Sequence, residues 1–290
     1  MKRIIPILAV LLLGAQLSAC SADRQIENQP VSTETPAKAA TPTQKPTATP
    51  ASMPNDETAS RTDQPSGAAA PGSNDDVLAA PLYRMTKAYR FVPIEESTTD
   101  KVVLLTFDDG PKDETILTSM LDTLDKHGAK AIFFVNGYRV KQNPELLKLI
   151  SKRGQTIGNH SWDHINLKNE TKEVVEKQIG DVQTDVEALI GKKPIFFRPP
   201  FGSGGDVVKG IVKNHGMLYM TWSDGSLDWD KSTKDKPEEV IRNVLEQLHP
   251  GANILMHELP WTAAALEKLL TKLEEKGYGY IDPASIDINH

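Results

Sequence analysis

The sequence predicts an α/β protein, built as a deformed, incomplete (β/α) barrel of about seven strands. Three observations support this prediction. Short apolar runs alternate with amphipathic helical stretches, the runs are apolar at consecutive positions, and polar clusters follow several of them. Consecutive apolar positions indicate strands that are buried on both faces, as in parallel sheets. Repeated βα units form a parallel sheet or barrel, and we favour the barrel over an open doubly wound sheet.

The strand-like runs are residues 102–107, 131–135, 156–158, 195–197, 217–221, 253–256 and 278–281. Helical stretches lie between most of them. Asn143 and Pro144 supply an N-cap and a first-turn proline for one helix. Residues 173–190 and 237–248 have the spacing of further amphipathic helices. A basic residue followed by glycine, as at residues 126–128, is typical of a helix end.

The amino end predicts export. Lys2 and Arg3 precede an apolar run at residues 4–13, which is too short to span a membrane and is typical of a signal peptide. Residues 17–20, Leu-Ser-Ala-Cys, resemble a bacterial lipobox, and Cys20 is the only cysteine in the chain. We therefore expect residues 1–20 to be a lipoprotein signal peptide with Cys20 lipidated. The alternative is an ordinary signal peptide with a coincidental cysteine.

Composition divides the remainder of the chain. Residues 21–80 are rich in Pro, Thr, Ala and Ser, and we expect a disordered linker that gives an anchored body reach into the cell wall. Residues 81–97 are expected to pack on the barrel as an N-terminal extension. We expect residues 98–283 to form the main folded domain and residues 284–290 a C-terminal tail.

The charge of the chain excludes one class of partner. A formal net charge of −6 gives no basic footprint for nucleic acid, so we expect neutral, cationic or metal partners. We also expect a monomer, located outside the cytoplasm and lipid-anchored to the cell membrane.

Two clusters at strand ends predict a metal site. Asp108 and Asp109 end an apolar strand before a Gly-Pro turn, and His160 and His164 follow another. Alone, the aspartates fit a solvated turn equally well. The histidines are four residues apart, a spacing that places both on one face of a helical turn. One aspartate with two histidines forms a three-ligand set that leaves positions open for water.

A third cluster follows the strand at residues 195–197. Pro199 and Pro200 lack a backbone N–H, so the first free amide after Arg198 is that of Phe201, which could donate to an oxyanion. Arg198 could pair with a catalytic aspartate and keep it ionised. The alternative is that Arg198 caps a carbonyl and that the prolines only shape a loop.

The last clusters supply an acid and aromatic surfaces. His257 ends a strand and is a candidate general acid, with Asp228 or Asp224 to orient it. The four tryptophans, Trp162, Trp222, Trp229 and Trp261, lie in or beside these loops. Their faces suit sugar rings, although they could instead only wall the site.

Five ordered motifs resemble those of the polysaccharide deacetylases, carbohydrate esterase family 4 with the NodB-type homology domain. They are Thr106-Phe107-Asp108-Asp109-Gly110, His160-Ser161-Trp162-Asp163-His164, Arg198-Pro199-Pro200-Phe201-Gly202, Asp228-Trp229 and Leu255-Met256-His257.

The resemblance implies a deformed (β/α) barrel and metal-dependent removal of acetyl groups from a glycan. It also implies that Asp109, His160 and His164 bind the metal. Asp108 would be the general base with Arg198 as its partner, and His257 would be the general acid. Trp229 and Leu255 would line the pocket for the acetyl group.

Two departures from the family pattern stand out. Phe201 occupies a position where the family commonly has tyrosine. The fourth motif usually carries an aspartate where Gly225 stands, and Asp224 comes one residue earlier. From this we expect the carboxylate that tunes His257 to be shifted or missing.

The combined expectation is a hydrolase that releases acetate from N-acetylglucosamine in peptidoglycan. The metal is expected to be Zn²⁺, with Co²⁺ and Ni²⁺ as alternatives. Two other functions stay open: a glycan-binding lipoprotein of this family without turnover, and an esterase acting on an O-acetylated polysaccharide such as xylan.

Overall fold

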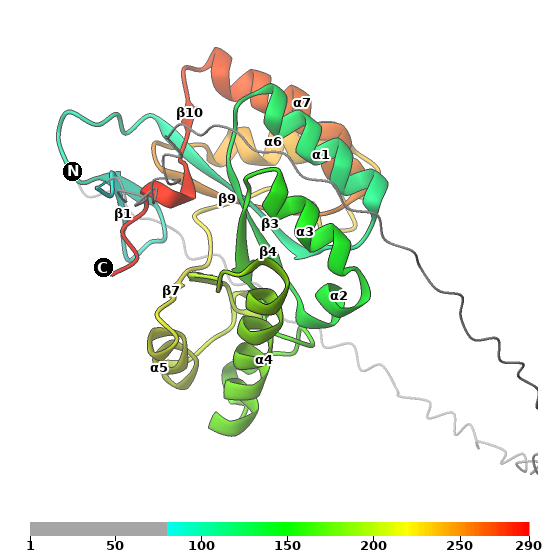
Figure 1. Cartoon of the computed structure of the whole chain (residues 1–290). Helices are drawn as coiled ribbons and strands as arrows, with labels where there is room; N and C mark the ends of the chain where they lie inside the picture. Colours follow the sequence, from blue (N-terminus) through cyan, green and yellow to red (C-terminus); the bar gives the residue numbers. More distant parts are fainter. Residues whose placement is uncertain (1–79, 290) are drawn as a thin grey trace, which may run out of the picture. The chain divides into compact units, whose positions relative to one another are not determined.

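A computed structural model describes residues 80–289. It confirms the incomplete (β/α) barrel (Figure 1). Seven strands pair in the order β7-β6-β5-β4-β3-β9-β8, every pairing on this path is parallel, and β10 also pairs with the start of β3. The strands are β1 Tyr83–Met85, β2 Phe91–Pro93, β3 Val102–Gly110, β4 Ala131–Val135, β5 Thr156–Asn159, β6 Phe196–Phe197, β7 Leu218–Tyr219, β8 Asp224–Gly225, β9 Ala252–His257 and β10 Gly279–Tyr280.

Helices cover the outer face of this sheet (Figure 1). They are α1 Glu114–Lys126, α2 Gly137–Gln142, α3 Pro144–Lys152, α4 Lys172–Ile190, α5 Asp206–Asn214, α6 Pro237–Gln247 and α7 Pro260–Glu275. Short 3-10 turns lie at Leu167–Asn169, Pro200–Gly202 and Pro283–Ser285. Several helix ends follow the expected chemistry: the Asp113 side chain accepts from the Ile116 N–H at the start of α1, and Gly191 closes α4 at φ 72°.

The consecutive apolar positions of β3 are explained by two cores. Val103, Leu105 and Phe107 point into the cluster under the helices, whereas Val102 and Leu104 point into a second cluster inside the barrel. Tyr83 and Phe91, from the β1–β2 hairpin, pack in this inner cluster. Both faces of β3 are therefore buried, which is why the strand shows no polar alternation.

The structure differs from the sequence prediction mainly in short elements. β8, β1 and β2 have two or three residues each, too few to show a periodic pattern, and α2 has six. Asn143 stands at the N-cap of α3 as predicted, but its side chain makes no cap bond. It donates instead to the Pro111 carbonyl at 3.1 Å.

The barrel has an open seam. Within residues 80–289, β7 and β8 do not pair, and the loop of residues 220–223 joins them. The Thr221 carbonyl in this loop accepts from Arg198 Nη2 at 2.8 Å and from Asn253 Nδ2 at 3.1 Å. The side chains of Arg198 and Asn253 therefore hold the loop between β7 and β8, where the two strands form no backbone hydrogen bonds with each other.

The predicted signal peptide with Cys20, and the predicted linker apart from its last residue, lie outside the described residues. Across residues 80–289, no helix combines the length and the hydropathy that a membrane span requires.

Candidate active site

A bulge in β3 brings Asp108 and Asp109 to the same site. Consecutive strand residues normally point to opposite faces. Here the register with β4 shifts between Asp108 and Gly110, and Asp109 adopts φ 68°. A bulge of this kind re-aims a side chain next to an active site. Asp108 is buried, and Asp109 remains partly exposed beside it.

His160 and His164 converge as predicted, but the helical turn expected between them is wrong. The segment is an irregular loop in which Ser161 and His164 have φ values of 64° and 55°. Left-handed backbone at non-glycine residues is uncommon and often marks functional sites. Asn136 Nδ2 donates to the His160 carbonyl, and the N–H groups of Gly137 and Tyr138 donate to the next two carbonyls of the loop.

Asp109, His160 and His164 form a cluster whose donor atoms lie within 4.8 Å of one another. Asp109 Oδ1 is 3.5 Å from His160 Nε2 and 3.2 Å from His164 Nε2, and it is buried without a hydrogen-bond partner among the described residues. Ligands about 2.1 Å from a tetrahedral Zn²⁺ stand about 3.4 Å apart. These three side chains therefore fit a divalent metal.

The ring of His160 is set in the tautomer that a metal requires. Its Nδ1 lies 2.7 Å from the Arg198 carbonyl, which can only accept, so Nδ1 carries the proton. Nε2 is left with its lone pair facing Asp109. A backbone carbonyl behind a ligating histidine is a common outer partner in metal sites.

The pKa values of two members of the cluster also favour the ligating forms. Burial lowers the pKa of His164 and outweighs the opposing effect of Asp109. Burial alone would raise the pKa of Asp109, but the neighbouring histidines and Lys112 outweigh it, and the net shift is downward. A neutral imidazole and an ionised carboxylate are the forms that bind a metal.

Arg198 is fully buried and holds Asp108. Its Nη1 donates to Asp108 Oδ1 at 2.8 Å and to Thr106 Oγ1 at 2.8 Å, and its Nη2 donates to Thr221 and Asn253. Asp108 Oδ2 is left facing the cluster of Asp109, His160 and His164, 3.6 Å from His160 Nε2. Arg198 makes the ion pair predicted for it rather than only a carbonyl cap.

His257 pairs with Asp228, which corrects the expectation that its tuning carboxylate is shifted or missing. Asp228 Oδ1 lies 2.7 Å from His257 Nδ1, while Oδ2 accepts from the His257 N–H and the Thr262 hydroxyl. Burial acts to lower the pKa of His257, but the Asp228 carboxylate outweighs it and the pKa is raised. Asp224 makes no contact of this kind.

The aromatic residues divide into two groups. Trp162 and Trp261 pack on the core under the helices, and Trp261 Nε1 donates to the Asp228 carbonyl. Trp229 is 45 % exposed, and its ring meets the His257 ring edge-on with the centroids 5.3 Å apart. The ring centroids of Trp222 and Trp229 are 6.3 Å apart. Leu255 is buried on the neighbouring strand β9.

Phe201 lies beside His164. It is 66 % exposed, has φ 59° and meets the His164 ring edge-on at 4.7 Å. The amides of Gly202 and Ser203 bond to the carbonyls of Pro199 and Pro200. The Phe201 N–H bonds to no other described residue, so it remains available as a donor.

The structure adds residues that the sequence reasoning missed. Thr106 and Asn253 accept hydrogen bonds from Arg198, and Thr262 donates one to Asp228. Gln178 and Glu258 accept hydrogen bonds from the backbone amides of loops that adjoin Asp109, His160 and His164. Thr106 and Asn253 did carry a signal, because each is a polar residue inside an otherwise apolar strand.

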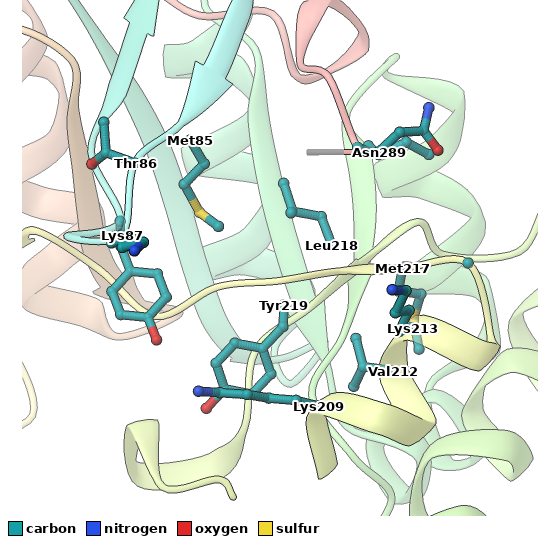
Figure 2. A pocket seen from close by; sticks show the side chains of 13 residues that line it. Met85, Thr86, Lys87, Lys209, Val212, Lys213, Met217, Leu218, Tyr219 and Asn289 are labelled. Carbon is teal, nitrogen blue, oxygen red and sulfur yellow. The ribbon is translucent and has the colours of Figure 1, made fainter. Parts of the chain in front are cut away.

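A sizeable cavity among the described residues lies away from this site. It has a volume of about 730 Å³ and is lined by β7, α5, the turn after β1 and the C-terminal residues (Figure 2). Met85, Met217 and Leu218 form apolar parts of its wall, and Lys87 and Lys209 are among its polar side chains. None of the predicted site residues lines this cavity, so the cavity is separate from the candidate site described above.

Comparison with known proteins agrees with this geometry. A family model described as polysaccharide deacetylase matches residues 95–220. The peptidoglycan-N-acetylglucosamine deacetylase of Bacillus cereus is 34 % identical over 199 residues, covering 66 % of this chain and 90 % of that protein. The peptidoglycan-N-acetylglucosamine deacetylase PgdA of Listeria monocytogenes is 37 % identical over 189 residues, covering 65 % of this chain.

The chain spans only 39 % of the length of the Listeria protein. Among solved structures, BA3943 of Bacillus anthracis, a CE4 family pseudoenzyme, superposes with a TM-score of 0.61 at 32 % identity, covering 65 % of this chain and 67 % of that one. The same fold is thus found in deacetylases and in a protein described as a pseudoenzyme.

Proposed function

The chain belongs to the polysaccharide deacetylases of carbohydrate esterase family 4, and we propose that it is a metal-dependent N-deacetylase of the bacterial cell wall. Its proposed substrate is N-acetylglucosamine in peptidoglycan, from which it releases acetate. One observation carries this proposal: the Asp109, His160 and His164 donor atoms gather beside Asp108, which Arg198 holds, and Asp108 is the β3 neighbour of His257, which Asp228 holds. The names of the Bacillus cereus and Listeria relatives support the choice of glycan.

Asp109, His160 and His164 are the proposed ligands, and Zn²⁺ is the proposed metal, with Co²⁺ and Ni²⁺ able to use the same donors. A divalent metal held there makes a nearby water more acidic and polarises the acetamide carbonyl. The remaining chemistry comes from the chain's own groups.

Asp108 is the proposed general base. Arg198 donates a hydrogen bond to Asp108 Oδ1, so Asp108 Oδ2 is free to accept the proton of the attacking water. The guanidinium fixes the orientation of this carboxylate. The water oxygen adds to the acetamide carbon, and the Phe201 N–H donates to the oxyanion that forms.

His257 is the proposed general acid. Its Nδ1–H is engaged by Asp228, so Nε2 delivers the proton to the leaving nitrogen. Because the pKa of His257 is raised, the protonated form persists at higher pH than for a free histidine. The C–N bond breaks, and acetate and a glucosamine unit are the products.

Trp229, Trp222 and Leu255 are proposed to hold the sugar and its acetyl methyl. The exposed ring of Trp229 beside His257 suits an apolar sugar face. Leu255 precedes His257 by two residues on β9, so both side chains point to the same face of that strand.

Acetate release from purified peptidoglycan and chito-oligosaccharides tests the proposal. Chelation should abolish release and Zn²⁺ should restore it. Asp108→Asn should lower kcat by about 10²- to 10⁴-fold while bound zinc, measured by elemental analysis, is unchanged. Full activity after chelation would refute metal dependence.

The same assay separates the alternatives. Release from acetylated xylan alone would favour an O-acetyl esterase. Saccharide and zinc binding without release from any substrate would favour a glycan-binding protein.

The location also remains a proposal. We infer from the sequence that Cys20 is lipidated, that residues 21–80 let the domain reach the wall, and that the protein acts as a monomer. Cys20→Ala should move the protein from the membrane fraction to the supernatant.

A further inference from the structure

Gln178 holds the loop between the two histidines without touching either of them. It lies on α4 and is 7 % exposed. Its Oε1 accepts the N–H groups of Trp162 at 3.1 Å and Asp163 at 2.8 Å, and its Nε2 donates to Asp163 Oδ2 at 2.7 Å. Three bonds from one side chain fix the middle of the loop relative to α4.

Glu258 does the same for the loop after Asp109. It is 2 % exposed and follows β9, and its Oε1 accepts the N–H groups of Lys112 at 2.9 Å and Asp113 at 2.8 Å. A Cβ placed on Gly110 would stand 2.6 Å from Glu258 Oε2. Glycine at position 110 therefore leaves room for this carboxylate.

The two loops need such anchors because their backbones are strained. Asp109, Ser161 and His164 all have φ between 55° and 68°. Residues held in such conformations cost of the order of 1–3 kcal/mol each and persist only where the surroundings enforce them. The anchors bond amides within a few positions of these strained residues, so releasing an anchor allows the donor atoms to separate.

We propose that Gln178 and Glu258 are positioning residues that set the metal affinity of the site, each by binding two consecutive amides of a ligand-bearing loop. This inference rests on the proposed function in one respect: Asp109, His160 and His164 must bind a divalent cation. It goes further in assigning a metal-linked role to two side chains whose hydrogen bonds go to Lys112, Asp113, Trp162 and Asp163 and not to the proposed ligands.

Gln155 provides a matched control. It is also a buried glutamine, 6 % exposed, and its Oε1 accepts the N–H of Ala131 at 2.8 Å while its Nε2 donates to the Ala129 carbonyl. Ala131 is the first residue of β4, so these bonds lie at the end of the strand away from the metal cluster. Gln155→Ala loses similar bonds and stability without releasing a ligand loop.

The experiment measures zinc binding rather than turnover. Full-length wild type and the Gln178→Ala, Glu258→Ala and Gln155→Ala variants are stripped of metal and titrated with Zn²⁺ against a chromophoric chelator. We expect Gln178→Ala and Glu258→Ala to bind zinc about 10- to 100-fold more weakly, as for other outer partners of metal ligands, and Gln155→Ala to stay within twofold. Equal affinity for wild type and both loop variants overturns the proposal, as does an equal loss in Gln155→Ala.

Two milder changes keep the test decisive if an alanine variant fails to fold. Glu258→Gln keeps the accepting oxygen, so its zinc affinity should stay within about threefold of wild type. Gly110→Ala crowds the Glu258 carboxylate and should weaken zinc binding with that side chain present. The absorption spectrum of the Co²⁺-loaded proteins should change in Gly110→Ala and not in Glu258→Gln, and the reverse pattern contradicts the inference.

The outcome for wild type separates the two proposals. Wild type that binds no zinc refutes the proposed function. If wild type binds zinc and the Gln178→Ala and Glu258→Ala variants bind it equally tightly, only the positioning role is refuted.

Discussion

Asp228 and Asp224 are four residues apart in one segment, and both are fully buried, yet their surroundings are opposite. Asp228 has its carboxylate bonded to His257 and Thr262. Neither oxygen of Asp224 has a hydrogen-bond partner among the described residues, and its strand partner Ile254 belongs to the apolar core under the helices.

The difference shows that burial alone does not mark a catalytic carboxylate. A buried carboxylate that accepts several hydrogen bonds can orient a neighbouring imidazole, whereas burial without partners favours the neutral acid. Burial raises the pKa of Asp224 to about 8. The family motif leads one to look for an aspartate at position 225, but the functional pairing is made by Asp228.

The largest effect is expected at Asp228. Asp228→Asn should lower kcat by about 10²- to 10⁴-fold, because His257 loses the carboxylate that orients it and raises its pKa. The alkaline limb of the pH–rate profile should move to lower pH. Bound zinc should be unchanged, and a kcat within threefold of wild type would contradict the pairing described here.

Asp224 should control stability rather than rate. Below pH 4 it is protonated in both the folded and the unfolded protein. As pH rises towards 8 it ionises only in the unfolded chain, so the folded protein loses stability across this window. We expect this group to cost about 1–3 kcal/mol of unfolding free energy near pH 8.

Urea unfolding at pH 4, 6 and 8 tests this expectation. Asp224→Asn should flatten the pH dependence relative to wild type and leave kcat within about threefold. Because other groups titrate in the same range, the difference between the two proteins is the relevant quantity. If the unfolding free energies of wild type and Asp224→Asn changed with pH in parallel, the Asp224 carboxylate would have a hydrogen-bond partner in solution and this expectation would be wrong.

The smallest effect is expected at Gly225, between the two aspartates. A Cβ there would lie 3.6 Å from Trp222 Nε1 and 3.7 Å from Trp229 Cη2, which is ordinary contact. Gly225→Ala should therefore fold normally, narrow the space beside the two rings and raise KM about two- to fivefold with little change in kcat. A large loss of kcat would mean that the segment must move during turnover.

The sequence predicted the sheet because long buried strands such as β3 leave an unmistakable apolar pattern. It also predicted which residues gather at the site, since parallel strands end at one rim. It did not predict how the chain turns there. The loop from His160 to His164 is held by α2 and by Gln178, and the bulge at Asp109 is a tertiary feature without a local signal.

Long-range partners were beyond the sequence for the same reason. Glu258 meets the amide of Asp113 across 145 residues, and Arg198 meets Thr106 across 92. Motif spacing indicates which residues carry chemistry, but it contains no measure of which distant side chain supports them.

The bridge at Thr221 ties catalysis to folding. The guanidinium that orients Asp108 also fastens the free edges of the sheet through that carbonyl, so one cation serves both reactivity and closure. Loss of the Arg198 side chain is therefore expected to loosen this part of the sheet as well as the orientation of Asp108.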